Sequence, residues 1–137
     1  MTDISMNTPA PAWPRLVGGF GLIWNLYGVY EYLTTVGILG PGGGSRPPMA
    51  DAMPMWVTAA FAIAVFAGAI GSFCLLLLNR WAIGLLFLSL LADLLWDVRM
   101  ASGSDHGSGL VLVASVTVIG IVLAWVAHSA GKKGWLR

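Results

Sequence analysis

Two aspartates, Asp93 and Asp97, stand in an otherwise apolar stretch, WAIGLLFLSLLADLLWDV, which runs from Trp81 to Val98. Residues four apart lie on one face of a helix, so the two carboxylates are expected side by side. A charged side chain at the centre of a membrane helix costs about 2.5–3.5 kcal/mol and usually faces the protein interior or water. The pair therefore predicts a polar site that other helices shelter.

A second group of polar and aromatic residues lies in the segment WNLYGVYEYL, residues 24–33. Glu31 is its only charged residue, and it shares a helical face with Trp24, Tyr27 and Gly28, which precede it by seven, four and three residues. Asn25 lies about 120° around the same helix from Glu31 and is expected to bond a neighbouring helix. This segment predicts a carboxylate with aromatic rings beside it.

The two faces together predict a pocket of carboxylates walled by aromatic rings. On the second helix we expect the shared face to hold Ser89, Asp93, Trp96 and Asp97. Such a pocket suits an organic cation, held by charge and by cation–π contact. It equally suits a sugar that stacks on the rings, or a proton relay through carboxyl groups. The candidate ligand-binding residues are Glu31, Asp93, Asp97, Trp24, Tyr27, Trp96 and Asn25.

The composition of the chain points to a membrane protein. Of its 137 residues 58% are hydrophobic and 9% are charged, and the mean hydropathy is +0.82. A soluble domain carries about 25% charged residues, so this chain has too few polar side chains to coat a globule. The net charge of +1 gives no reason to expect a nucleic acid partner. A single cysteine, Cys74, excludes an intrachain disulfide and a cysteine metal cluster.

Four apolar segments are each about long enough to cross a bilayer, at about 16–36, 55–78, 81–98 and 109–127. We therefore predict an all-α integral membrane four-helix bundle in one domain, residues 15–131. A flexible, proline-rich tail (1–14) precedes it and a basic tail (132–137) follows it. Only Asn79 and Arg80 separate the second and third segments, which indicates an antiparallel hairpin.

The basic residues predict the orientation of the bundle. Two of the seven lie on one side, Arg46 and Arg99, and five lie on the other: Arg15, Arg80, Lys132, Lys133 and Arg137. The positive-inside rule then places both termini in the cytoplasm. At a rise of about 1.5 Å per residue, the three acids of the pocket lie at similar depth in the outer half.

No catalytic or phosphate-binding motif is present, and the residues indicate neither a metal site nor a particular cofactor. His106, in the loop above the acids, is a weak basis for a metal ligand because it stands alone. The first hypothesis is a protein that binds or transports a small solute, a sugar or an organic cation. Beyond the lipid bilayer, its partner would be a second copy or a larger membrane complex.

Two other functions stay open. One is an accessory subunit of a larger membrane complex, which would dock through a stripe of small residues, Ala60, Ala64, Gly68 and Ser72. The other is a membrane-embedded enzyme that uses Asp93 or Glu31 as a general acid or base on a lipid-soluble substrate.

Most of residues 15–137 resembles a family of small four-helix bacterial inner-membrane proteins that often carry the name sugar transporter. The resemblance lies in WNLYGVYEYL, PMWVTAAFAIAVFAGAIGSFCLLL, NRWAIGLLFLSLLADLLWD and the terminal GWLR. The matching positions are Trp24, Asn25, Gly28, Tyr32, Trp56, Gly68, Gly71 and Trp81. The resemblance implies a multi-pass protein of the bacterial inner membrane and a role in transport, and it assigns no role to a residue.

Overall fold

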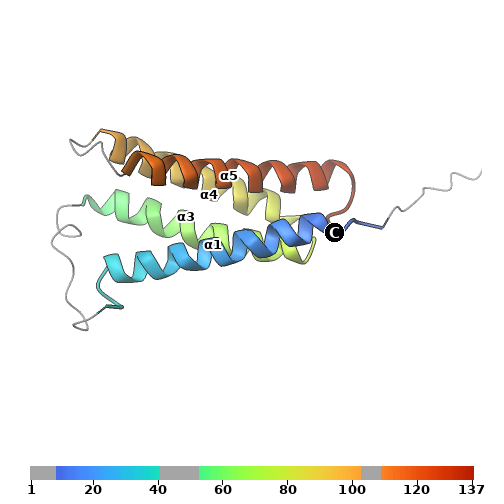
Figure 1. Cartoon of the computed structure of the whole chain (residues 1–137), viewed down its shortest axis with the longest axis horizontal. Helices are drawn as coiled ribbons and strands as arrows, with labels where there is room; N and C mark the ends of the chain where they lie inside the picture. Colours follow the sequence, from blue (N-terminus) through green and yellow to red (C-terminus); the bar gives the residue numbers. More distant parts are fainter. Residues whose placement is uncertain (1–8, 41–52, 103–108) are drawn as a thin grey trace, which may run out of the picture.

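The computed structural model describes residues 9–40, 53–102 and 109–137, and all regular structure within these ranges is helical. Four helices follow one another along the chain: α1 (Trp13–Thr35), α3 (Met55–Leu76), α4 (Trp81–Ala101) and α5 (Gly109–Lys132). They run alternately in opposite directions along one long axis (Figure 1). The prediction of an all-α chain with four helices is confirmed.

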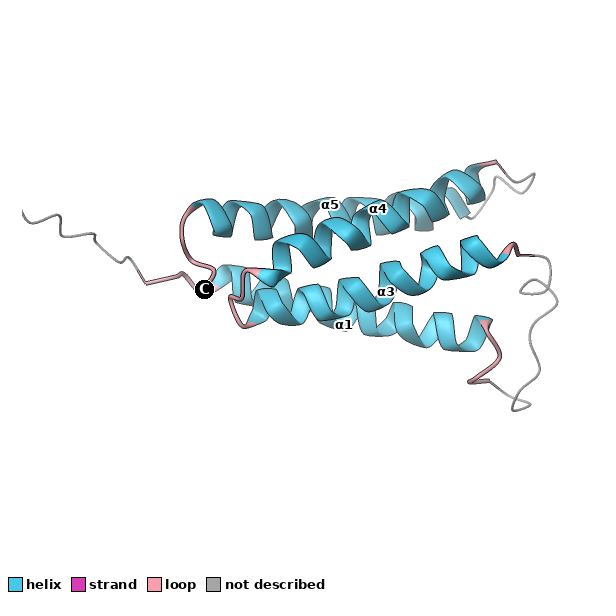
Figure 2. Cartoon of the chain, turned by 180° about the vertical axis from the view of Figure 1, so that it is seen from behind, coloured by secondary structure: helices cyan, strands magenta, loops and turns pink. Residues whose placement is uncertain are grey.

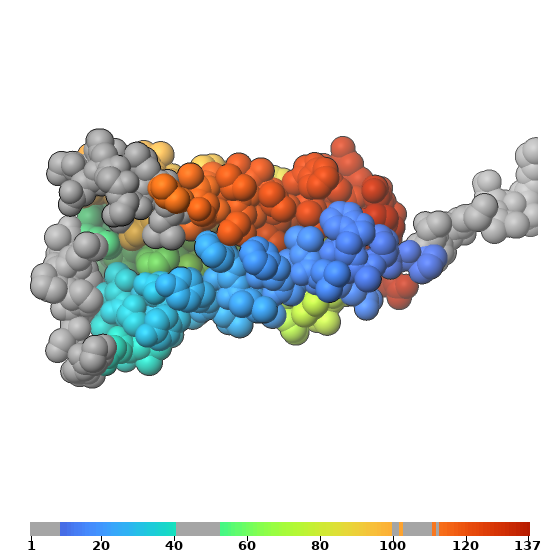
Figure 3. All heavy atoms as spheres, viewed as in Figure 1, coloured from blue at the N-terminus to red at the C-terminus, as the bar shows by residue number. Residues whose placement is uncertain are grey.

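The helices pack in the order of the chain. α3 packs extensively against α1 and α4, α4 packs against α5, and α1 touches α5 less extensively. α1 and α4 therefore lie on opposite sides of the bundle, which Figure 2 shows from the α3–α4 side. The opposite face shows α5 above α1, with α3 visible between them toward the end where α1 finishes (Figure 3). We call this the acidic end, because Glu31, Asp93 and Asp97 lie nearest to it.

The other end, which we call the terminal end, holds the start of α1, the α3–α4 turn and the C-terminus (Figure 1). Leu78 makes the turn with a φ of 56°, and the Asn79 side chain accepts a hydrogen bond from the backbone N–H of Trp81 at 3.0 Å. The chain terminus is tied to this turn. The Arg137 N–H donates to the Leu78 carbonyl at 2.8 Å, and the Arg80 N–H donates to the Arg137 carbonyl at 3.0 Å.

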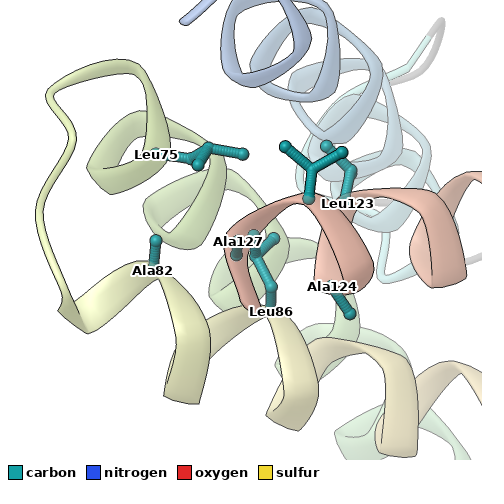
Figure 4. Packing of buried hydrophobic residues seen from close by; sticks show 7 residues of the cluster. Leu75, Ala82, Leu86, Leu123, Ala124 and Ala127 are labelled. Carbon is teal, nitrogen blue, oxygen red and sulfur yellow. The ribbon is translucent and has the colours of Figure 1, made fainter. Parts of the chain in front are cut away.

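The buried core lies near the terminal end and combines leucine, valine and alanine side chains (Figure 4). Its members come from α3, α4 and α5: Leu75, Ala82, Leu86, Leu123, Ala124, Val126 and Ala127. Leu136 of the terminal segment packs against this cluster. The alanines of this cluster let the helix backbones approach closely, as in membrane helix packing.

Three of the helices are long and apolar enough to cross a membrane: α3, residues Trp81–Arg99 of α4 and residues Val113–Lys132 of α5. This supports the prediction of a membrane protein for three of the four expected spans. α1 has 23 residues but is not among them. Its sequence includes Asn25, Glu31 and several tyrosines and glycines, which lower its hydropathy. Large apolar side chains are exposed on every helix, among them Leu16, Ile63, Leu91 and Val118.

The stripe of small residues on α3 lies inside the chain. Ala60, Ala64, Gly68 and Ser72 are all buried, and α1 and α4 pack over them. A Cβ atom at Gly68 would collide with Asn25 Oδ1 of α1 and would lie 2.8 Å from Ser89 Oγ of α4. Within this chain the stripe therefore serves the packing of α3 against α1 and α4.

Candidate functional site

Asp97 lies in the contact between α4 and α5, which we call the α4–α5 seam. Its side chain is 8% exposed, although it stands only one turn before the end of α4. The Thr117 hydroxyl of α5 is hydrogen-bonded to Asp97 Oδ2. The other carboxyl oxygen, Oδ1, is buried and has no hydrogen-bond partner among the residues that the structure describes. A buried polar atom without a partner is uncommon and calls for an explanation.

Asp93 lies one turn deeper along the same seam and is partly buried. It faces α5 at Gly120, where an added Cβ atom would lie 3.6 Å from Asp93 Oδ2 and 3.1 Å from Leu90 Cδ1. The Asp93 carboxyl group therefore lies beside α5 at Gly120. The seam therefore holds two carboxyl groups one helical turn apart, as their spacing predicts.

Ser89 and Trp96 turn toward α3 instead. The Ser89 hydroxyl donates to the Ala64 carbonyl at 2.7 Å. The Trp96 ring stacks on Phe61 with ring centroids 4.7 Å apart and an interplanar angle of 29°. Consecutive helical residues differ by about 100° in direction, so Trp96 and Asp97 contact different neighbours. The prediction that these side chains share one face with Asp97 is wrong.

An aromatic group joins three helices near the acidic end. Tyr32 of α1 meets Phe61 and Phe66 of α3 edge-on, with ring centroids 5.6 and 5.8 Å apart, and Phe61 continues the contact to Trp96 of α4. Aromatic pairs of this kind contribute about 0.5–1.5 kcal/mol each beyond the area they bury. This group fixes the spacing of α1, α3 and α4 at the depth of the acids.

Asn25 bonds a neighbouring helix, as the sequence predicts. Its amide group donates to Ser72 Oγ of α3 at 3.4 Å and to the Gly21 carbonyl of its own helix at 2.8 Å. Its side-chain oxygen lies over Gly68. These contacts hold α1 against α3 and give Asn25 a structural role.

Glu31, Tyr27 and Trp24 form a separate group on α1. The Tyr27 side chain is 58% exposed, and Tyr27 lies one helical turn before Glu31 on the same face of α1. Glu31 and Trp24 are partly buried. Among the described residues, no hydrogen bond or ion pair joins this group to Asp93 or Asp97. In this part of the chain, α1 and α4 also do not pack extensively against each other. The structure thus distributes the seven candidate residues over several places in the bundle.

Within the described residues, no three His, Cys, Asp or Glu side chains gather closely enough to hold a metal ion. The predictions that involve Arg46 and His106 lie outside the described residues. The polar groups of the seam are two carboxyl groups and one hydroxyl. Their oxygen atoms can take up a proton or accept hydrogen bonds from a small cation that carries N–H groups.

Two residues of the seam were not predicted as site residues from the sequence. Thr117 also bonds its own helix, since its hydroxyl lies 3.0 Å from the Val113 carbonyl. Its contact with Asp97 depends on how α5 is aligned along α4, which no local pattern encodes. Nothing in the sequence distinguishes Gly120 as a site residue, because the same helix holds other small residues.

A scan of protein-family models, a search of curated proteins and a search of solved structures found no match to this chain.

Proposed function

We propose that this chain is an integral membrane protein that binds a small organic cation at the Asp93–Asp97 pair and carries it across the bilayer. The observation that carries the proposal is the buried Asp97 carboxyl group, whose Oδ1 has no partner among the described residues. A ligand with N–H groups and a positive charge would supply the missing partner. It would also offset the charge that a carboxylate brings into an apolar region.

All four helices are spans in this proposal. α1 has 23 residues and, at about 1.5 Å per residue, reaches roughly 34 Å, which exceeds a hydrocarbon core of about 30 Å. It packs along α3, which is itself apolar enough to cross a membrane. The polar residues that lower its hydropathy are partly sheltered, since Asn25 bonds α3.

The distribution of charge supports an orientation with both termini in the cytoplasm. Five basic residues, Arg15, Arg80, Lys132, Lys133 and Arg137, belong to the terminal end. Arg99 is the basic residue described at the acidic end. The sequence resemblance supports the inner membrane of a bacterium as the location. The aspartates then lie in the outer half of the membrane.

An organic cation fits the seam better than a sugar does. A sugar presents many hydroxyl groups, each of which both donates and accepts hydrogen bonds. The seam offers fewer polar partners than that, namely two carboxyl groups and one hydroxyl. The rings near the acids also contact one another instead of presenting a free stacking face, since Trp96 lies on Phe61. Four helices make a narrow bundle, so a path through the membrane would involve a second copy of the chain.

The experiment is uptake of radiolabelled methylammonium by proteoliposomes that contain the purified chain. We expect uptake that Asp93→Asn removes and that Ser115→Ala leaves unchanged. Ser115 is a matched control because its hydroxyl bonds the Val111 carbonyl one turn earlier on α5 and has no contact with either aspartate among the hydrogen bonds of the described residues. Uptake of glucose without uptake of methylammonium would contradict the choice of a cation. Equal methylammonium uptake by the Asp93→Asn protein would contradict the assignment of the site.

A further inference from the structure

The hydroxyl group of Thr117 has more acceptors than it can serve. It has one hydrogen to donate, yet its oxygen lies within hydrogen-bond distance of both Asp97 Oδ2 and the Val113 carbonyl, the latter at 3.0 Å. If Asp97 is ionised, the hydrogen must point to its carboxylate, and the contact with the Val113 carbonyl then has no proton. The buried Oδ1 would in addition carry charge without a partner.

A proton on Asp97 satisfies both contacts at once. The carboxylic acid donates from Oδ2 to the Thr117 hydroxyl oxygen, and the hydroxyl donates to the Val113 carbonyl. Oδ1 is then the carbonyl oxygen of a neutral acid, which tolerates burial without a partner far better than a charged oxygen does. The arrangement of hydrogen bonds in the seam therefore fits a protonated Asp97.

Few other charged groups can compensate Asp97 in the part of the chain that the structure describes. α5 presents Thr117 and Gly120 to the two aspartates, and its titratable residues, His128 and Lys132, lie toward the terminal end. α3 contains no acidic or basic residue. On α4 the neighbours are Asp93, which adds like charge, and Arg99, which is exposed. Glu31 of α1 has no described contact with the seam.

We infer that Asp97 holds a proton in the ligand-free chain and releases it when a monovalent ammonium-type cation binds between Asp97 and Asp93. This inference rests on the proposed function, since it identifies the class of cation and the exchange that accompanies its binding. The O–H bond at Oδ2 breaks, its electron pair stays on the carboxylate, and the proton passes to water. The Thr117 hydroxyl then donates to Oδ2, and an N–H group of the cation donates to Oδ1.

Exchange of one proton for one monovalent cation leaves the net charge of the seam unchanged. One positive charge arrives as one proton leaves, so the net charge of the seam is the same before and after the exchange. The oxygen atoms of the seam accept hydrogen bonds from N–H groups. This favours an ammonium group that carries N–H over a quaternary ammonium group, which has no N–H to donate.

The test adds methylammonium chloride to the full chain in lipid nanodiscs, in weakly buffered solution with a pH indicator, while calorimetry measures binding. We expect a proton to be released for each cation bound. Over the range in which Asp97 stays protonated, the apparent Kd should fall about tenfold for each unit by which the pH rises, because protons compete for the same group. Sodium chloride at equal ionic strength is the blank. Asp97→Asn should abolish the release, and Ser115→Ala should not change it.

The outcomes separate this inference from the proposed function. Binding without proton release, or release that persists in Asp97→Asn, overturns the exchange while cation binding stands. No binding at all overturns both. Infrared difference spectra of the unsubstituted chain provide a second measurement that does not depend on a variant. We expect the carbonyl band of a protonated carboxylic acid to disappear when methylammonium is added, and a band that is absent or unchanged contradicts the inference.

Discussion

Gly18→Ala should separate α1 from α3 and destabilise the chain. A Cβ atom at Gly18 would lie 2.6 Å from the backbone nitrogen of Leu76 and 3.0 Å from the Ser72 carbonyl oxygen. Both are backbone atoms of α3, so no side chain can rotate to make room. Overpacking of this kind costs about 1–3 kcal/mol. An alanine inside a helix is favoured over glycine by about 0.5–1 kcal/mol, so the net loss should lie in the range of about 0–2.5 kcal/mol.

Gly84→Ala provides the matched control for this prediction. Gly84 lies inside α4, and an added Cβ atom there would meet nothing within 4 Å. This variant should gain the helix preference without the collision, so the difference between the two variants measures the overpacking alone, about 1–3 kcal/mol. The assay is reversible unfolding in mixed detergent micelles, followed by circular dichroism. Equal stabilities for the two variants would refute the close approach of α1 to α3 at Gly18.

Three further predictions concern other contacts. Phe61→Ala removes the ring that joins α1 to α4. It should lower the unfolding free energy by about 1–3 kcal/mol for two aromatic pairs and weaken the near-ultraviolet circular dichroism of tryptophan. An unchanged spectrum would contradict the ring contacts. Deletion of residues 136–137 removes two backbone hydrogen bonds to the α3–α4 turn and should lower the unfolding free energy by about 1–3 kcal/mol, and an unchanged thermal unfolding curve would contradict this role. Asp97→Asn should stay within about 1 kcal/mol of the parent chain, because its amide group can donate to Thr117 as a protonated acid does; a large loss in an unfolding titration would contradict a neutral Asp97.

The number and kind of the elements could be predicted because they depend on local properties of the chain. Runs of about twenty apolar residues indicate helices, and the short Asn79–Arg80 connection indicates a hairpin. Asn25 could be assigned to an interhelical bond because a polar side chain in an apolar helix needs a partner, and Ser72 provides it. The two carboxyl groups could be placed together because four residues make about one helical turn.

The way the helices face one another could not be predicted from the sequence. Trp96 and Asp97 are consecutive, and which of them faces α3 or α5 depends on the rotation of α4 within the bundle. The pairing of Asp97 with Thr117 depends on the alignment of two helices along their axes. The small-residue stripe on α3 suits either an internal or an external helix, and its burial follows only from the packed arrangement.

Solid-state NMR on the full chain in lipid bilayers tests the cation site most directly, with nitrogen-labelled methylammonium as ligand and carboxyl-carbon labels on aspartate or on glutamate. Glu31 is the only glutamate in the sequence, so the two labelling schemes separate the α4–α5 seam from the α1 group. We predict a nitrogen–carbon contact in the aspartate-labelled protein that Asp97→Asn removes. A contact in the glutamate-labelled protein alone, or an aspartate contact that survives Asp97→Asn, would contradict the assignment of the site.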